Sequence, residues 1–182
     1  TINIVYNNIT RFYSIDGISN GLAQTNDYFG TSVKFLNNNL FVIGSPGHGY
    51  DYNGNPVTNT GAIYSYILNG NTINNDTIIS NPYQNTTYAG FGSKIKRSSD
   101  TSFVTGTTTN IVNIRNRIGD KNWQTVNSLN VQVNGVSDIC FNGKTLLIGN
   151  ISNSYITNTV HSLPYNLQTN QGGIGIFNLT NG

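Results

Sequence analysis

The chain has 182 residues, of which only 9% are charged, and its formal net charge at pH 7 is +2. Nucleic-acid binding requires a denser positive surface, so we expect no nucleic-acid partner. No apolar stretch approaches the ~18 residues of a membrane-spanning helix, and a single cysteine excludes an intrachain disulfide. Asparagine is the most frequent residue, but regularly spaced runs of Val, Ile, Leu, Phe and Tyr predict a folded chain rather than a disordered one.

The first 27 residues predict one or two strands, which we assign to a preceding unit of the fold. Residues 1–6 largely alternate apolar and polar side chains, and residues 10–15 form a second run. Asn7-Asn8 lies between the two runs and provides the residues of a hairpin turn.

A unit of four strands is predicted at about residues 28–80. Its first and third runs, residues 28–35 and 61–66, alternate apolar with small or polar side chains, which is typical of half-buried strands. The second run, residues 40–44, is apolar on both faces, as in a strand that is covered on both sides. The fourth run, residues 72–79, is less apolar and suits an outer edge.

Two further units repeat this pattern less completely, at about residues 88–130 and 131–182. Phe91-Gly92 repeats Phe29-Gly30 about 60 residues later, whereas the third unit lacks a Phe-Gly pair. Four-stranded repeats of this length are typical of propeller blades. We therefore predict an all-β fold, a partial β-propeller of about three four-stranded antiparallel blades. A parallel β-helix or a fibre-like sandwich is the competing fold, but its repeats would recur every ~18–25 residues.

The best-formed unit resembles a known repeat. Phe29-Gly30-x-Ser32-Val33, then Val42-Ile43-Gly44-Ser45-Pro46, then Gly61-Ala62-Ile63-Tyr64-Ser65-Tyr66 is similar to the FG-GAP repeat of integrin α-subunit propellers. Similar repeats occur in many bacterial, protist and viral surface proteins. The second copy keeps Phe91-Gly92 and Gly106, and the third keeps the Ile-Gly strand end and the glycine-rich last strand.

The resemblance implies a seven-bladed propeller, which at about 50 residues per blade needs roughly twice this length. We therefore expect residues 1–182 to form a single propeller-like domain, or a fragment of one, that belongs to a larger ring or to an open version of the fold. The chain contains no Met, even at position 1, which suits an excerpt or a processed piece of a longer protein.

Many members of the family bind calcium in a loop resembling Asp-x-Asp-x-Asp-Gly. The matching connection here reads Asp51-Tyr52-Asn53-Gly54-Asn55. Calcium favours several carboxylates among its oxygen ligands, and this segment offers one. We therefore expect no cofactor and no metal, with Asp51, Asn53 and Asn55 as a weak candidate site for calcium.

A catalytic site needs titratable groups that converge in a cleft, and this chain has few of them. It contains seven carboxylates, two histidines and one cysteine. Five of the carboxylates are predicted in turns or at their edges: Asp16, Asp27, Asp51, Asp76 and Asp120. The histidines, His48 and His161, fall in two long polar connections. We therefore expect a protein that is not an enzyme.

Three further features carry expectations about packing. Cys140 lies in the apolar run of residues 139–141 and is expected to be a buried small hydrophobe. Trp123 is expected to anchor the packing between sheets rather than to contact a ligand. The basic residues of Lys94-Ile95-Lys96-Arg97 and Arg115-Asn116-Arg117 are expected at exposed strand positions and hairpin ends.

The function prediction rests on the long connections, residues 45–60 and 150–171, which are rich in Tyr, Asn and Gly. Tyrosine offers apolar area with a polar tip at low entropic cost. The candidate partner-binding residues are His48, Tyr50, Asp51, Tyr52, Asn53, Tyr155 and Tyr165.

We predict a non-enzymatic structural or interaction protein of a large surface assembly, such as a virion shell or a cell-surface layer, with other subunits as its partners. The alternative is an extracellular adhesion module that binds a glycan or a cell-surface protein through these loops. The Asn, Ile and Tyr bias is typical of AT-rich genomes, which are common in large DNA viruses and some protists. Either interpretation places the protein outside the cell or on a virion surface.

Overall fold

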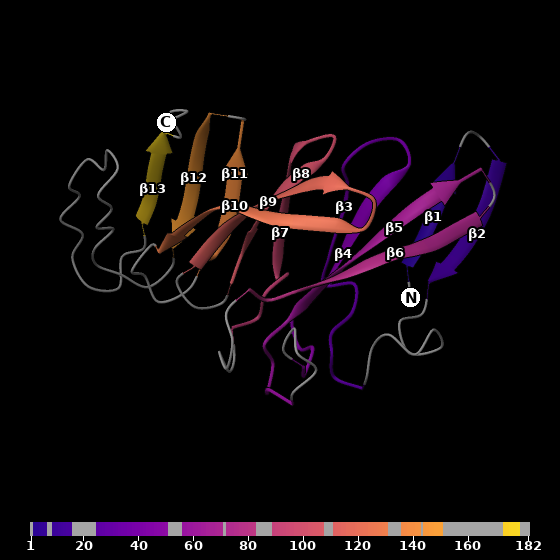
Figure 1. The fold of residues 1–182 in the computed structure, drawn as a ribbon, viewed down its shortest axis with the longest axis horizontal. Coiled ribbons are helices and arrows are strands. Elements are labelled where there is room, and N and C mark those ends of the chain that lie inside the picture. Colours follow the sequence, from indigo (N-terminus) through magenta and orange to yellow (C-terminus); the bar gives the residue numbers. More distant parts are fainter. Residues whose placement is uncertain are drawn as a thin grey trace.

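The computed structural model describes residues 2–6, 9–15, 25–50, 56–70, 72–82, 89–107, 111–130, 136–142, 144–150 and 173–178. Over these ranges the regular secondary structure consists of strands, and every pair of strands is antiparallel. The all-β prediction is therefore confirmed. The sheets follow one another along the longest axis of the molecule (Figure 1), and none closes into a barrel.

The chain begins with a two-stranded hairpin, here the N-terminal hairpin, made of β1 (Ile2–Tyr6) and β2 (Ile9–Ile15). The first sheet has the order β3-β4-β5-β6 and consists of β3 (Ser32–Phe35), β4 (Leu40–Ser45), β5 (Ala62–Asn69) and β6 (Thr72–Ser80). As predicted, β6 lies at an edge, and the turn before it contains Gly70 with a φ of 56°.

The second sheet repeats this order with β7 (Lys94–Ser99), β8 (Ser102–Gly106), β9 (Ile111–Gly119) and β10 (Asn122–Asn130). The third sheet pairs β11 (Asp138–Phe141), β12 (Thr145–Asn150) and β13 (Gly173–Asn178) in that order. Each sheet is a simple meander, because consecutive strands are also neighbours in space.

The hydrophobic core lies between sheets rather than inside one, and each neighbouring pair of layers has its own cluster. Ile15 of the N-terminal hairpin packs on β4 and β5 of the first sheet. The first and second sheets share a cluster of Leu36, Leu40, Val42, Ile63, Ile79, Phe91, Ile95 and Phe103. The second and third share Val104, Val112, Leu129, Val136, Ile139, Leu146 and Ile148.

Strand β4 shows how the two-sided burial arises. All six of its residues are buried. Phe41 and Ile43 belong to the cluster with the N-terminal hairpin, whereas Leu40 and Val42 belong to the cluster with the second sheet. A strand with a sheet on each side can be apolar at every position, so the prediction for residues 40–44 is confirmed.

Three packing expectations are tested by burial. Trp123 packs beside Phe103 at the boundary of the first two sheets, with ring centroids 5.1 Å apart, as expected. Cys140, however, is exposed, because strand alternation turns Ile139 inward and its neighbour outward. The prediction of a buried cysteine was therefore wrong.

The charged residues of β6 and β9 were also misplaced by the sequence analysis. Asp76 lies in the middle of β6 and not in a turn, and its side chain is 1% exposed. Arg115 and Arg117 are largely buried instead of exposed, because they point into the space between the first and second sheets. An ion pair of 2.9 Å joins Arg117 to Asp76 across that space.

Candidate functional site

A polar cluster forms where the turn before β3 meets the connection after β4. The carbonyl oxygen of Asp27 accepts hydrogen bonds from the backbone N–H of Gly47 at 3.0 Å and from Ser45 Oγ at 2.9 Å. The backbone N–H of His48 donates to the carbonyl of Ser45 at 3.1 Å, and its carbonyl accepts from the N–H of Gly61. These bonds fix the position of His48 beside Asp27.

The side chains of this cluster meet at the imidazole of His48. Its Nδ1 lies 3.1 Å from Asp27 Oδ2 and 3.2 Å from the hydroxyl of Tyr64, which comes from β5. Asp27 is 5% exposed at its side chain, so its contact with His48 is shielded from water. Burial, and then the negative charge of Asp27, raise the pKa of Tyr64 above its usual range. Tyr64 therefore stays a neutral phenol.

Aromatic side chains surround the cluster. The ring of Tyr50 lies 5.8 Å from that of His48, and Phe29 meets Tyr64 edge to face at 5.3 Å. Tyr28, next to Asp27 in the chain, is 64% exposed. Rings that combine an apolar face with hydrogen-bonding groups suit the binding of a glycan or a protein surface. Asp27 and Tyr64 are buried, so Tyr28 is the ring that the cluster exposes most fully to solvent.

The predicted partner-binding residues are only partly placed by the structure. It brings His48 and Tyr50 together, and adds Asp27 and Tyr64, which the sequence analysis assigned to a turn and to a scaffold strand. The other candidates lie outside the described residues: Asp51, Tyr52, Asn53, Tyr155 and Tyr165, together with Asn55 of the weak calcium candidate. Among the residues that are described, no three His, Cys, Asp or Glu side chains gather as metal ligands.

A hollow of about 450 Å³ opens between the outer strands of the first and second sheets. Its walls come from the end of β6 and from β9 and β10, and they include Arg115, Lys121 and Trp123. The guanidinium of Arg115 donates to Thr125 and, at 3.5 Å, to the carbonyl of Ser80. Sequence reasoning missed this hollow, because residues from two separate repeats form it.

The Phe-Gly pair of the second unit is inserted into the first sheet, and this defines what we call the glycine junction. Phe91 forms a parallel bridge with Gly61, and its N–H donates to the carbonyl of Thr60 at 3.2 Å. The carbonyl of Gly92 accepts from Ser32 Oγ at 2.6 Å. A Cβ on Gly44 would overlap that carbonyl, whose carbon would lie 2.9 Å away.

Two of these glycines also adopt left-handed backbone, with a φ of 85° at Gly61 and 88° at Gly92. Other residues rarely adopt such angles without strain. The glycines that the sequence analysis identified in separate repeats therefore meet in space, where the backbones of two sheets come together.

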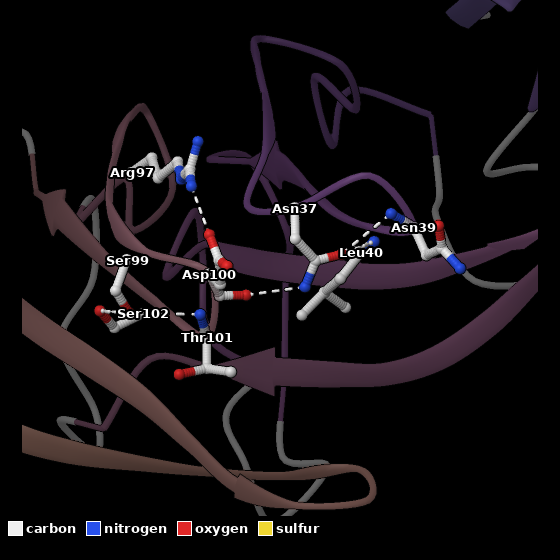
Figure 2. Close-up of polar contacts among 8 residues, drawn as sticks. All are labelled: Asn37, Asn39, Leu40, Arg97, Ser99, Asp100, Thr101 and Ser102. Atoms are coloured by element: carbon white, nitrogen blue, oxygen red, sulfur yellow. Dashed lines mark hydrogen bonds and ion pairs between the residues drawn. The ribbon is translucent and has the colours of Figure 1, made fainter.

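The opposite ends of the same strands are joined by hairpin turns (Figure 2). Asn37 Nδ2, in the β3–β4 turn, donates to the carbonyl of Asp100 in the β7–β8 turn at 2.9 Å. The Oδ1 of Asn37 accepts from the backbone N–H groups of Asn39 and Leu40. One asparagine thus closes its own turn and contacts the next sheet.

The same closure recurs in the other two sheets. Ser99 Oγ accepts from the N–H of Thr101 at 3.2 Å, and Asn142 Oδ1 accepts from the N–H groups of Lys144 and Thr145 at 3.0 and 2.7 Å. Side chains of this type favour tight turns because they bond to the backbone two residues on.

Within the described ranges, no helix has the length and apolarity needed to cross a membrane. No family model and no curated protein matches this chain.

Proposed function

We propose that this chain is a non-enzymatic structural protein of a large surface assembly, a virion shell or a cell-surface layer, and that its sheets are blades of an FG-GAP-type propeller. The observation that carries the proposal is the glycine junction. Phe91-Gly92 of the second repeat enters the first sheet between Gly44 and Gly61, so these two repeats are locked together. A motif that joins one sheet to the next builds an extended scaffold.

The arrangement of the strands supports blades that are stacked around an axis. The first strands of successive sheets lie side by side, since β3 contacts β7 and β7 contacts β11. The last strands, β6 and β10, lie at the opposite edges of their sheets. Propeller blades place their first strands along the axis and their last strands outside. We infer that the rest of the ring comes from chain or subunits beyond these three sheets.

The use of charge supports a structural role. Asp76 on β6 accepts a hydrogen bond from Ser65 at 2.8 Å and pairs with Arg117 of the next sheet at 2.9 Å. Lys96 of β7 pairs with Asp138 of the third sheet at 3.3 Å. These titratable groups hold neighbouring sheets together, which is the work of a scaffold.

The second candidate function is adhesion to a glycan or a cell-surface protein. The observation that favours it is the exposed ring of Tyr28 beside the pair of Asp27 and His48. On this interpretation a Tyr28→Ser variant loses binding to a glycan array or to intact cells. Val126→Ser, at an equally exposed position on β10, is the matched control.

The surface-assembly proposal is tested by locating the protein in its source. Antibodies raised against the folded chain are applied to intact and to permeabilised particles or cells, and bound antibody is imaged by electron microscopy. We expect dense labelling of the intact surface in a regular array. Labelling that requires permeabilisation, or sparse labelling without order, contradicts the proposal.

A further inference from the structure

The third sheet exposes apolar side chains at positions that the first two sheets bury. Val42 on β4, Val104 on β8 and Leu147 on β12 each lie two residues before the glycine that ends the apolar run. Val42 and Val104 are fully buried, because each packs against the sheet that follows. Leu147 is 36% exposed.

The neighbouring strand shows the same contrast more strongly. Ile63 pairs with Gly44, Val112 with Gly106 and Ile174 with Gly149, so the three occupy one register position. The first two have no exposed area, whereas Ile174 is 67% exposed. We call Leu147 and Ile174 the trailing face of the third sheet.

The other end of the molecule exposes the complementary position. Val33 pairs with Ile43, Ile95 with Thr105 and Ile139 with Ile148, which again defines one register position. Ile95 and Ile139 are 4% and 1% exposed because each is inserted against the preceding sheet.

Val33 is 38% exposed instead, and Phe35 on the same side of β3 is 41% exposed. The N-terminal hairpin covers β4 and β5 through Ile15, but the side chains of β3 stay open. We call Val33 and Phe35 the leading face of the first sheet.

We propose that the trailing face of one copy docks against the leading face of a second copy of this chain. The inference rests on the proposed stacking of repeats, and it names the partner. One chain carries the trailing half of the contact that it makes twice internally, between the first and second sheets and between the second and third. It also carries the β3 part of the leading half, which the N-terminal hairpin on β4 and β5 leaves open. The copies therefore meet head to tail, by continuation of an existing interface.

The internal contacts specify which residues meet. Within the chain, Phe91 bridges to Gly61 and packs in one cluster with Ile63. Phe29 is the equivalent of Phe91 in the first repeat, and Ile174 is the equivalent of Ile63 in the third sheet. Phe29 of the second copy therefore meets Ile174. A head-to-tail contact between identical copies is not self-limiting, so it produces rows or a ring rather than only a dimer.

The register also provides a chemical probe. Cys140 occupies the position of Lys96, since they pair with Leu147 and Val104 respectively. Lys96 forms an ion pair with Asp138 of the next sheet. Asp138 precedes Ile139, and Ile139 is the counterpart of Val33 in the third sheet. Cys140 of one copy therefore lies near position 33 of the next.

The first experiment uses a Val33→Cys variant of the full chain and a short bismaleimide cross-linker. Each copy then has two thiols on opposite ends, and head-to-tail docking produces a ladder of dimers, trimers and larger species on a denaturing gel. The unmodified chain, with Cys140 alone, and a Val33→Cys/Cys140→Ser variant each stop at the dimer. A double-thiol chain that also stops at the dimer overturns the proposal.

The second experiment removes the docking without a cysteine. Ile174→Asp places a charge in the trailing face. The control variant Val126→Asp places a charge at an equally exposed position on β10. By sedimentation velocity we expect self-association of the unmodified chain and of Val126→Asp, weakened about tenfold or more by Ile174→Asp.

Equal association of the two variants, or an unmodified chain that stays monomeric at every concentration, overturns the inference. Surface labelling of the source is an independent readout. A labelled surface with a monomeric purified chain rejects docking between copies and leaves the surface-assembly function intact. A cross-linked ladder without surface labelling supports docking between copies and rejects the surface-assembly function.

Discussion

The two junctions between sheets are built from the same register positions but with different chemistry. At the glycine junction between the first and second sheets, backbone meets backbone, with the carbonyl of Gly92 lying over Gly44. At the next junction Val136 occupies the place of Gly92, and its side chain lies over Gly106. There a Cβ on Gly106 would be 3.0 Å from Val136 Cγ1 and 2.9 Å from Ile139 Cδ1.

The difference shows what the Phe-Gly motif contributes. Where it is present, two sheets share backbone hydrogen bonds, and a buried ion pair and a turn-to-turn bond add to them. Where it is absent, methyl groups fill the space and the polar link is the exposed pair of Lys96 and Asp138. Repeats can therefore lose the motif and still stack, because apolar packing replaces the backbone contact.

The largest expected effect comes from the buried ion pair of Asp76 and Arg117 between the first and second sheets. Asp76→Ala leaves Arg117 buried without its carboxylate partner, and we expect a loss of about 3–5 kcal/mol in the free energy of unfolding. Asp120 is fully exposed and also lies near Arg117, at 3.6 Å, so Asp120→Ala is the matched control. Urea denaturation measures both variants, and equal losses would refute the assignment of the pair.

Gly44→Ala should be the next most destabilising. Its methyl group would overlap the backbone of Gly92, which cannot move without separating the two sheets. We expect a loss of about 3 kcal/mol, the upper part of the range for overpacking. Gly119→Ala has no heavy atom within 4 Å of its new methyl group and controls for the loss of a glycine.

Gly106→Ala tests the second junction in the same way. The atoms that it meets are the ends of Ile139 and Val136, which can shift, so we expect a loss of only about 1 kcal/mol. Thermal unfolding followed by circular dichroism ranks it against Gly44→Ala. If the two substitutions cost the same, the distinction between backbone and side-chain junctions is wrong.

The smallest effect concerns the exposed pair of the second junction. The backbone N–H of Ile139, and less strongly Lys96, hold the pKa of Asp138 below its usual value of 3.8. A carboxyl group whose pKa is lower in the folded than in the unfolded state stabilises the fold at a pH above its unfolded-state pKa. This contribution is lost as the pH falls through the folded-state pKa. In Lys96→Met we expect the pKa of Asp138 to rise but to stay below 3.8, because the backbone N–H of Ile139 still donates to it. A carbon-13 NMR titration of the Asp138 carboxyl group measures this pKa. Because the pair is exposed, the stability should change by well under ~1 kcal/mol.

Most of the strand pattern could be predicted from the sequence, because alternation and turn residues are local signals. The run at residues 40–44 is an example. The run at residues 61–66 is also a strand, as predicted, but the half-buried environment expected for it was wrong, because both of its faces are buried. The predictions that failed concern the burial and the contacts of single residues. Asp76 and Arg117 lie on strands of different repeats, so no local pattern indicates that they face each other.

The candidate site was predictable only in part for the same reason. His48 and Tyr50 belong to one polar connection, and its composition singled them out. Asp27 is remote from that connection in the chain, and Tyr64 belongs to an alternating strand whose side chains were assigned to the scaffold. The hydrogen bonds that bring Gly47 to Asp27 are made by the backbone, so side-chain identity carries no signal for them.

The side chains that close the hairpin turns have a consequence for the conditions in which the protein can work. Asn37, Ser99 and Asn142 hold the turns of all three sheets through uncharged donors and acceptors. Dissolved ions screen interactions between charges, but they leave these neutral bonds largely unaffected. We therefore expect these side-chain closures of the turns to persist at low and at high ionic strength alike.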